Sequence, residues 1–207
     1  MSDINCLKCK VIFVGDSSVG KSCIINRYIN NSFSNLVEVT LGCNSLLKTI
    51  TIDKYNIKFD IWDTAGMEKF RSLNAQFYKD ANIVIFVYEI INLNSFNWIK
   101  NYWYNDVIEN SNKNVILGLI GNKSDLYLEN EEVSEEDARN YANEINAVFK
   151  LTSALNGSGI NELFEILAKE YIKKYKNNML IGNLIDNKPK LEKQIFKKKV
   201  SKKFCWN

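Results

Sequence analysis

One stretch near the N-terminus, residues 15–22, reads Gly15-Asp16-Ser17-Ser18-Val19-Gly20-Lys21-Ser22 and matches the pattern G-x-x-x-x-G-K-[ST]. It follows an apolar run at 8–14, which predicts a buried strand, and precedes residues 22–30, which predict a helix. Glycines there let backbone N–H groups surround phosphate oxygens beside the positive end of the helix. Lys21 adds a charge for the outer phosphates, and the Ser22 hydroxyl can bind Mg²⁺. The stretch predicts a nucleoside triphosphate site without identifying the base.

Outward from this loop, apolar runs alternate with helical patterns. Strands are predicted at 44–52, 56–62, 83–88, 115–120 and 148–151, and helices at 95–109, from Ser134 onward with Asp137 in its first turn, and at 160–175. The alternation predicts βαβ units. We therefore expect an α/β fold of the P-loop type, with a six-stranded, mostly parallel sheet flanked by five helices. We also expect residues 1–176 to form one domain and residues 177–207 to form a flexible basic tail.

Composition narrows the classes of function. The 207 residues, 46% of them hydrophobic, suffice for one domain with a substantial core. No apolar run is long enough to span a membrane, and the first residues lack the pattern of a secretory signal. Five scattered cysteines predict a reduced, cytosolic protein, and Cys6 and Cys9 have no second pair at zinc spacing. The absence of histidine excludes an imidazole base and a His-ligated zinc.

A second motif, Asn122-Lys123-Ser124-Asp125, follows the strand at 115–120. Open α/β sheets bind ligands at the carboxyl ends of their strands. The motif resembles the N-K-x-D element of GTP-binding proteins, and a carboxylate can accept two hydrogen bonds from the edge of guanine. We expect Asp125 to discriminate the base, Lys123 to pack along it, and Asn122 to tie the loops together.

The next strand is followed by Thr152-Ser153-Ala154-Leu155, which resembles the S-A-K or S-A-L element of the same proteins. In that element a backbone amide meets the guanine carbonyl oxygen. A third motif, Asp63-Thr64-Ala65-Gly66, ends a strand. Its Asp63 resembles the carboxylate that holds Mg²⁺ through water, and the amide of Gly66 can contact a γ-phosphate.

The order of these motifs resembles the Ras superfamily, and most closely its Rab branch, over about residues 6–176. The Rab-like signs are Trp62, Lys69-Phe70-Arg71-Ser72-Leu73, Phe77-Tyr78-Lys79-Asp80-Ala81 and Thr152-Ser153-Ala154-Leu155. The resemblance implies a small G domain that switches between GTP and GDP in vesicle traffic, with Mg²⁺ as cofactor. It also implies an exchange factor, a GTPase-activating protein and effectors as partners of a monomer on the cytosolic face of an intracellular membrane, with no nucleic acid.

The resemblance also assigns the site. Its nucleotide-binding residues are Gly15, Asp16, Ser17, Ser18, Val19, Gly20, Lys21, Ser22, Cys23, Phe33, Thr40, Gly66, Asn122, Lys123, Asp125, Ser153, Ala154 and Leu155. The metal ligands are Ser22, Thr40 and Asp63, and the catalytic positions are Lys21, Gly66 and Met67. The nucleotide state is implied to order or release residues 33–45 and 63–73.

Three departures from the family pattern affect activity and partner choice. Met67 stands where the family has the glutamine that orients the attacking water, and a thioether cannot donate a hydrogen bond. Gly42-Cys43-Asn44-Ser45 replaces G-V-D-F, and Val37 replaces a tyrosine. We expect slowed GTP hydrolysis; the alternative is a GTP-binding module without significant hydrolysis. A P-loop kinase or ATPase is a second alternative, against which Asp125 and the D-T-A-G element argue.

The C-terminal stretch is basic. Residues 177–207 contain eight lysines against one Asp and one Glu, which predicts attraction to anionic membrane surfaces. Cys205 stands third from the end and predicts lipidation, although the ending is neither C-a-a-X nor a double cysteine. The alternative is a solvated tail with an unmodified thiol.

Overall fold

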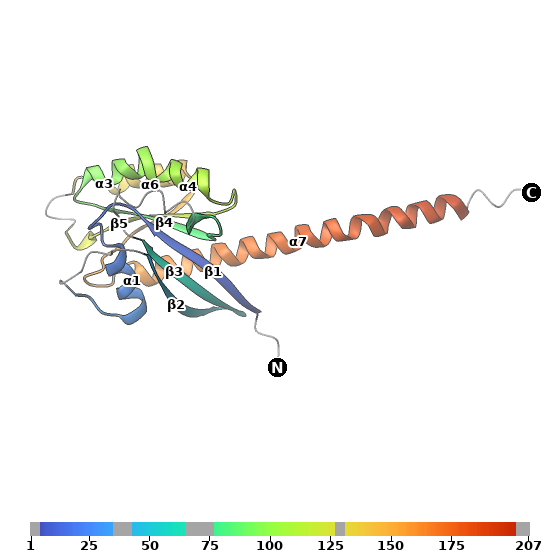
Figure 1. Cartoon of the computed structure of the whole chain (residues 1–207), viewed down its shortest axis with the longest axis horizontal. Helices are drawn as coiled ribbons and strands as arrows, with labels where there is room; N and C mark the ends of the chain where they lie inside the picture. Colours follow the sequence, from blue (N-terminus) through green and yellow to red (C-terminus); the bar gives the residue numbers. More distant parts are fainter. Residues whose placement is uncertain (1–4, 35–42, 65–76, 127–130, 202–207) are drawn as a thin grey trace, which may run out of the picture. The chain divides into compact units, whose positions relative to one another are not determined.

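A computed structural model describes the backbone of residues 5–34, 43–64, 77–126 and 131–201 (Figure 1). Six strands form one sheet in the order β2-β3-β1-β4-β5-β6. The strands are β1 (Asn5–Val14), β2 (Cys43–Ile52), β3 (Tyr55–Thr64), β4 (Ile83–Glu89), β5 (Ile116–Asn122) and β6 (Ala147–Leu151). Only the β2–β3 pair is antiparallel among the described strands, and its turn contains Asp53 at φ 52°. The predicted α/β class and the mostly parallel six-stranded sheet are confirmed.

The described helices are α1 (Lys21–Asn30), α3 (Leu93–Trp98), α4 (Tyr104–Asn110), α6 (Glu135–Glu144) and α7 (Ile160–Ser201). A π-helical turn, η2 (Ile99–Trp103), joins α3 to α4, and η3 (Ser124–Leu126) is a short 3₁₀ turn. The helix predicted at 95–109 is therefore one longer segment with a widened turn inside it. Ser134 caps α6 as predicted, accepting a hydrogen bond from the Asp137 amide.

Helix α7 differs from the prediction. It was expected to end at residue 175 but continues to Ser201. The prediction ended this helix where its apolar periodicity stops. The lysines and leucines beyond that point favour helical backbone without the periodicity, although Gly182 and Pro189 within the helix disfavour it. The chain divides into two compact units, residues 1–169 and 170–207, so the expected boundary at 176 lies within one continuous helix. The flexibility predicted for the tail stays a prediction.

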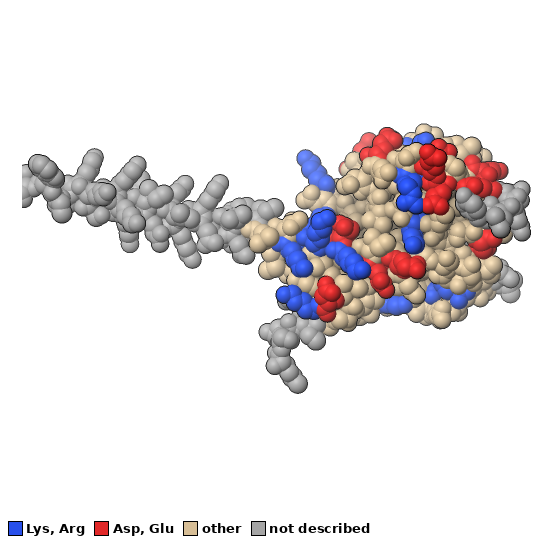
Figure 2. Space-filling view, turned by 180° about the vertical axis from the view of Figure 1, so that it is seen from behind, with Lys and Arg blue, Asp and Glu red and all other residues tan. Residues whose placement is uncertain are grey.

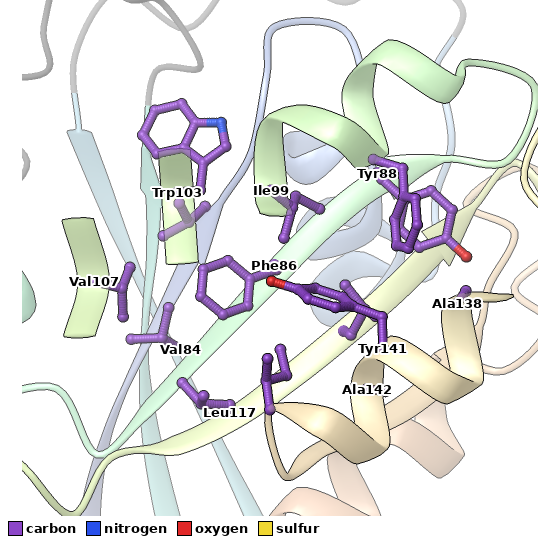
Figure 3. Close-up of a cluster of buried hydrophobic side chains, with 14 of the residues drawn as sticks. Val84, Phe86, Tyr88, Ile99, Trp103, Val107, Leu117, Ala138, Tyr141 and Ala142 are labelled. Carbon is purple, nitrogen blue, oxygen red and sulfur yellow. The ribbon is translucent and has the colours of Figure 1, made fainter. Parts of the chain in front are cut away.

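The core of the first unit lies on both faces of the sheet. On one face, side chains from the strands pack against α3, η2, α4 and α6 (Figures 1 and 3). The cluster includes Phe86, Tyr88, Ile99, Trp103 and Val107. On the other face the ring of Phe164 stacks on Tyr28 of α1 with centroids 3.5 Å apart and also contacts Phe59 at 5.6 Å. Burial on both faces explains why β4 carries no charged residue before its last one, Glu89.

The surface mixes charges of both signs. Figure 2 shows acidic and basic side chains interspersed over the face that it draws, an arrangement that avoids a large field of one sign there. Within the described residues, no helix combines the length and apolar character needed to cross a bilayer.

Candidate nucleotide site

The loop between β1 and α1 has a backbone that requires its glycines. Gly15 has φ 146° and Gly20 has φ 94°, conformations that L side chains rarely adopt. Space excludes a side chain as well. A Cβ on Gly15 would lie 2.2 Å from the Val87 carbonyl oxygen, and one on Gly20 would lie 2.3 Å from Asn122 Nδ2. The turn therefore brings the loop against the ends of β4 and β5, with the start of α1 behind it.

Lys21 is held inside this loop. Its side chain is only 5% exposed, and its Nζ donates hydrogen bonds to the carbonyl oxygens of Gly15 at 2.9 Å and Asp16 at 2.6 Å. Burial lowers the pKa of Lys21 to about 8, while the nearby Asp63 and Asp16 act in the opposite direction. A buried ammonium that is short of negative charge is suited to an anionic ligand such as a phosphate group.

Ser22 and Asp63 meet beside Lys21 and offer hard oxygen atoms. Asp63 is 7% exposed, and burial raises the pKa of its carboxyl, although a hydrogen bond with Ser22 and the charge of Lys21 lower it. Asp63 Oδ1 has no hydrogen-bond partner among the described residues. A hydroxyl beside an unsatisfied buried carboxylate oxygen fits Mg²⁺, which binds through one or two protein oxygens and substrate phosphates. Among the described residues, no three acidic or cysteine side chains are placed to hold a metal ion together, and a Mg²⁺ site of this kind does not need three.

Asn122 joins three loops. Its side chain is 1% exposed, its Nδ2 donates to the Val19 carbonyl at 2.8 Å, and its Oδ1 accepts from the Thr152 hydroxyl at 3.2 Å. One buried amide therefore connects three loops, at residues 15–20, 122–125 and 152–155. Leaving such a group unpaired costs about 1–3 kcal/mol, so the three loops favour one mutual arrangement.

Two further side chains of the 122–125 motif, those of Lys123 and Asp125, each have a partner. Lys123, at φ 64°, forms an ion pair with Glu89 at 2.7 Å. Asp125 Oδ1 accepts a hydrogen bond from the Ser153 hydroxyl. Both contacts orient the side chains at the carboxyl ends of β4, β5 and β6, where the sequence placed a base site. Ser153 and Ala154 are buried, Leu155 is exposed, and Cys23 and Phe33 are partly exposed.

Several predicted positions lie outside the described residues. They are Thr40, Gly66, Met67, Cys205 and most of the ranges 33–45 and 63–73. The structure thus brings together the 15–20 loop, Asp63 and the loops at 122–125 and 152–155. Their roles in binding a ligand stay predictions.

Three residues that support the site belong to none of the sequence motifs, so the sequence analysis did not predict them. Glu89 pairs with Lys123, Trp103 Nε1 donates to Asp16 Oδ1 at 3.0 Å, and Arg27 bonds the 154–155 backbone. Trp103 lies 87 positions from Asp16, so only the fold brings them together.

Comparison with known proteins agrees with this geometry. A family model, the Ras family, matches residues 10–174. The putative ras-related protein Rab-5B of Dictyostelium discoideum is 39% identical over 168 residues, covering 81% of this chain and 77% of that protein. The human Ras-related protein Rab-22A is 40% identical over 155 residues, covering 75% and 79%. The Ras-related protein SEC4 of Saccharomyces cerevisiae is 36% identical over 173 residues, covering 84% and 79%.

Proposed function

We propose that this chain, which belongs to the Ras family and is a small GTPase of the Rab type, is a GTP/GDP switch acting in vesicle traffic. In this proposal the nucleotide lies along the loops that follow β1, β5 and β6. The partners are an exchange factor, a GTPase-activating protein and effectors on the cytosolic face of an intracellular membrane.

The observation that carries the proposal is the joining of the loops through Asn122. Phosphate chemistry and base chemistry lie far apart in the sequence, at Lys21 and Asp125. The Asn122 amide nevertheless bonds Val19 on one side and Thr152 on the other. A site that must bind both ends of one nucleotide needs such a connection, whereas two unrelated loops do not.

Each group has a role that follows from its surroundings. Lys21, desolvated and anchored on two carbonyl oxygens, binds the outer phosphates. Ser22 and Asp63 would hold Mg²⁺, which when bound neutralises charge on the phosphates. Asp125, held by Ser153, accepts hydrogen bonds from the guanine edge. Phosphoryl transfer needs little covalent chemistry from the protein, so the main task of these residues is to bind and orient the substrate.

Base specificity tests the proposal. Asp125→Asn exchanges an acceptor oxygen for a donor, so guanine nucleotides should bind more weakly and xanthine nucleotides more tightly than in the wild type. Displacement of a fluorescent GDP analogue by GDP and by XDP measures both effects. The control is Asp137→Asn, at an exposed position of α6. Unchanged guanine affinity in Asp125→Asn would show that Asp125 does not read the base.

We infer further that hydrolysis is slow, because Met67 replaces the water-orienting glutamine of the family. Intrinsic hydrolysis in such proteins is already on the order of 10⁻⁴ per second. Met67→Gln should raise the single-turnover rate, since it restores a donor and an acceptor beside the water. If the wild type already hydrolyses GTP as fast as this variant, another residue positions the water. If neither hydrolyses GTP while both bind it, the binding-module alternative is favoured.

A further inference from the structure

Arg27, on the outer part of α1, bonds three backbone carbonyl oxygens with one guanidinium. Its Nε donates to Ala154 at 2.8 Å, its Nη2 to Leu155 at 2.5 Å, and its Nη1 to Asn31 at 3.0 Å. Two of the acceptors lie 127 and 128 positions away in the sequence. The guanidinium is planar, permanently charged and rich in donors, so it can fix several acceptors in one geometry.

The first loop that Arg27 contacts leaves the end of α1. Asn31 is the C-cap of that helix at φ 51°, and its amide bonds the Arg27 carbonyl at 2.9 Å. The neighbouring Asn26 side chain donates to the Ser32 carbonyl at 3.2 Å and to the Ser32 hydroxyl at 3.1 Å. These bonds set the path of the chain into Phe33, which the family resemblance places against the guanine.

The second loop follows β6. Because a peptide unit is planar and trans, holding the Ala154 oxygen toward Arg27 points the Leu155 N–H in the opposite direction. The loop is closed behind Leu155 by a bond from the Gly157 amide to the Ser153 carbonyl at 2.8 Å. A Cβ on Gly157 would lie 3.6 Å from Arg27 Cδ, so the loop packs on the Arg27 stem as well. This is the loop whose backbone amides the resemblance directs at the guanine oxygen.

We propose that Arg27 is a positioning residue for guanine recognition, which fixes both walls of the base site at once. It does not touch the nucleotide; it sets the direction of the 154–155 amides and the position of Phe33. The proposal rests on the proposed function, because the two loops are walls of a base site only if the chain binds a guanine nucleotide. The phosphate loop has its own supports in Lys21 and Asn122, so the effect of Arg27 should be confined to the base.

Arg27→Met tests this, because methionine keeps much of the aliphatic stem and removes all three hydrogen bonds. Removing one hydrogen bond to a charged donor typically changes an equilibrium by roughly ten-fold or more. GDP should therefore dissociate roughly ten-fold faster from Arg27→Met than from the wild type, as followed by release of a fluorescent GDP analogue. Arg27→Lys, which keeps the charge but replaces the planar fork of donors by a single ammonium group, should give an intermediate rate.

The preference for GDP over ADP separates positioning of the base site from general damage. Adenine has no 6-oxo group for the 154–155 amides, although its ring can still contact Phe33, so Arg27→Met should weaken GDP binding more than the weak binding of ADP. Lys21→Ala, which damages the phosphate side, should weaken both. Arg139→Met is the matched control, since Arg139 pairs with Glu135 on the exposed surface of α6 and should change neither. Equal loss of GDP and ADP binding in Arg27→Met, or wild-type GDP release, would overturn the proposal.

Hydrogen exchange gives a readout that does not depend on the nucleotide. In the full-length chain, Arg27→Met should exchange faster than the wild type in peptides covering both 31–34 and 153–157, with no change around Lys21. If the wild type failed to bind guanine nucleotides, the proposed function would fall, and this exchange pattern would still report whether Arg27 fixes the two loops. Unchanged exchange in both loops would overturn the role of Arg27 whatever the nucleotide result.

Discussion

The buried ammonium of Lys21 predicts that nucleotide binding takes up protons above neutral pH. Protein groups alone lower the pKa of Lys21 to about 8 from 10.5, chiefly by burial. A phosphate beside Nζ supplies the negative charge that favours the protonated form, so binding should return the pKa toward its ordinary value. The proton that Lys21 gains must come from the solvent.

The size of the effect follows from the pKa. With a pKa of about 8 before binding, Lys21 lacks roughly 0.1 proton at pH 7, 0.5 at pH 8 and 0.9 at pH 9, and each missing fraction is taken up when the nucleotide binds. The same pKa shift also makes the free energy of unfolding depend on pH. The unfolded chain binds this proton up to pH 10.5 and the native chain only to about 8, so the free energy of unfolding without nucleotide rises between these pH values. The rise from Lys21 is about 3 kcal/mol at most.

Calorimetry of GDP binding in two buffers of different ionisation enthalpy measures the uptake directly at pH 7, 8 and 9. Lys21→Arg is the control, because a guanidinium stays protonated over the whole range, and any uptake that it retains belongs to other groups. Uptake in the wild type that stays near zero at pH 8 and 9 would refute the reasoning. It would mean that Lys21 is already fully protonated before the nucleotide binds.

Two other predictions concern Trp103 and Cys205. Trp103→Phe removes the indole N–H that bonds Asp16 and shrinks a side chain that is 2% exposed, so it should lower the free energy of unfolding by about 1–3 kcal/mol and speed GDP release. Trp98→Phe, at a 43% exposed position of the same helical segment, is the control, and equal unfolding midpoints for the two variants would contradict the prediction. Cys205→Ser should move the protein from the membrane to the soluble fraction of its own cell, since one lipid chain and a basic stretch together give stable anchoring. Membrane levels equal to the wild type would exclude anchoring through that residue.

How far the sequence predicts this site depends on where each interaction partner lies. The turn around Gly15 and Gly20 depends on residues close together in the sequence, so the motif of glycines and lysine is enough to predict its backbone geometry. The Arg27 contacts are different, because their acceptors are main-chain carbonyls that any residue would present. The Lys123–Glu89 pair also needs the fold, since it forms only where β4 and β5 end side by side. Motifs therefore identified the groups expected to touch the nucleotide, and the groups that hold them needed the structure.

The π-helical turn inside the helix predicted at 95–109 is a feature that the sequence analysis did not predict. Ile99, Trp103 and Val107 are all buried against the sheet at two successive spacings of four (Figure 3). In a regular α-helix each step of four residues overshoots a full turn by about 40°, so three such positions drift to one side of the helix. A π-turn holds more residues per turn and brings them back onto one face. That drift of about 80° over three positions still fits the apolar stripe of a regular α-helix, so the spacing alone does not predict the widened turn. The turn ends at Trp103, the donor to Asp16.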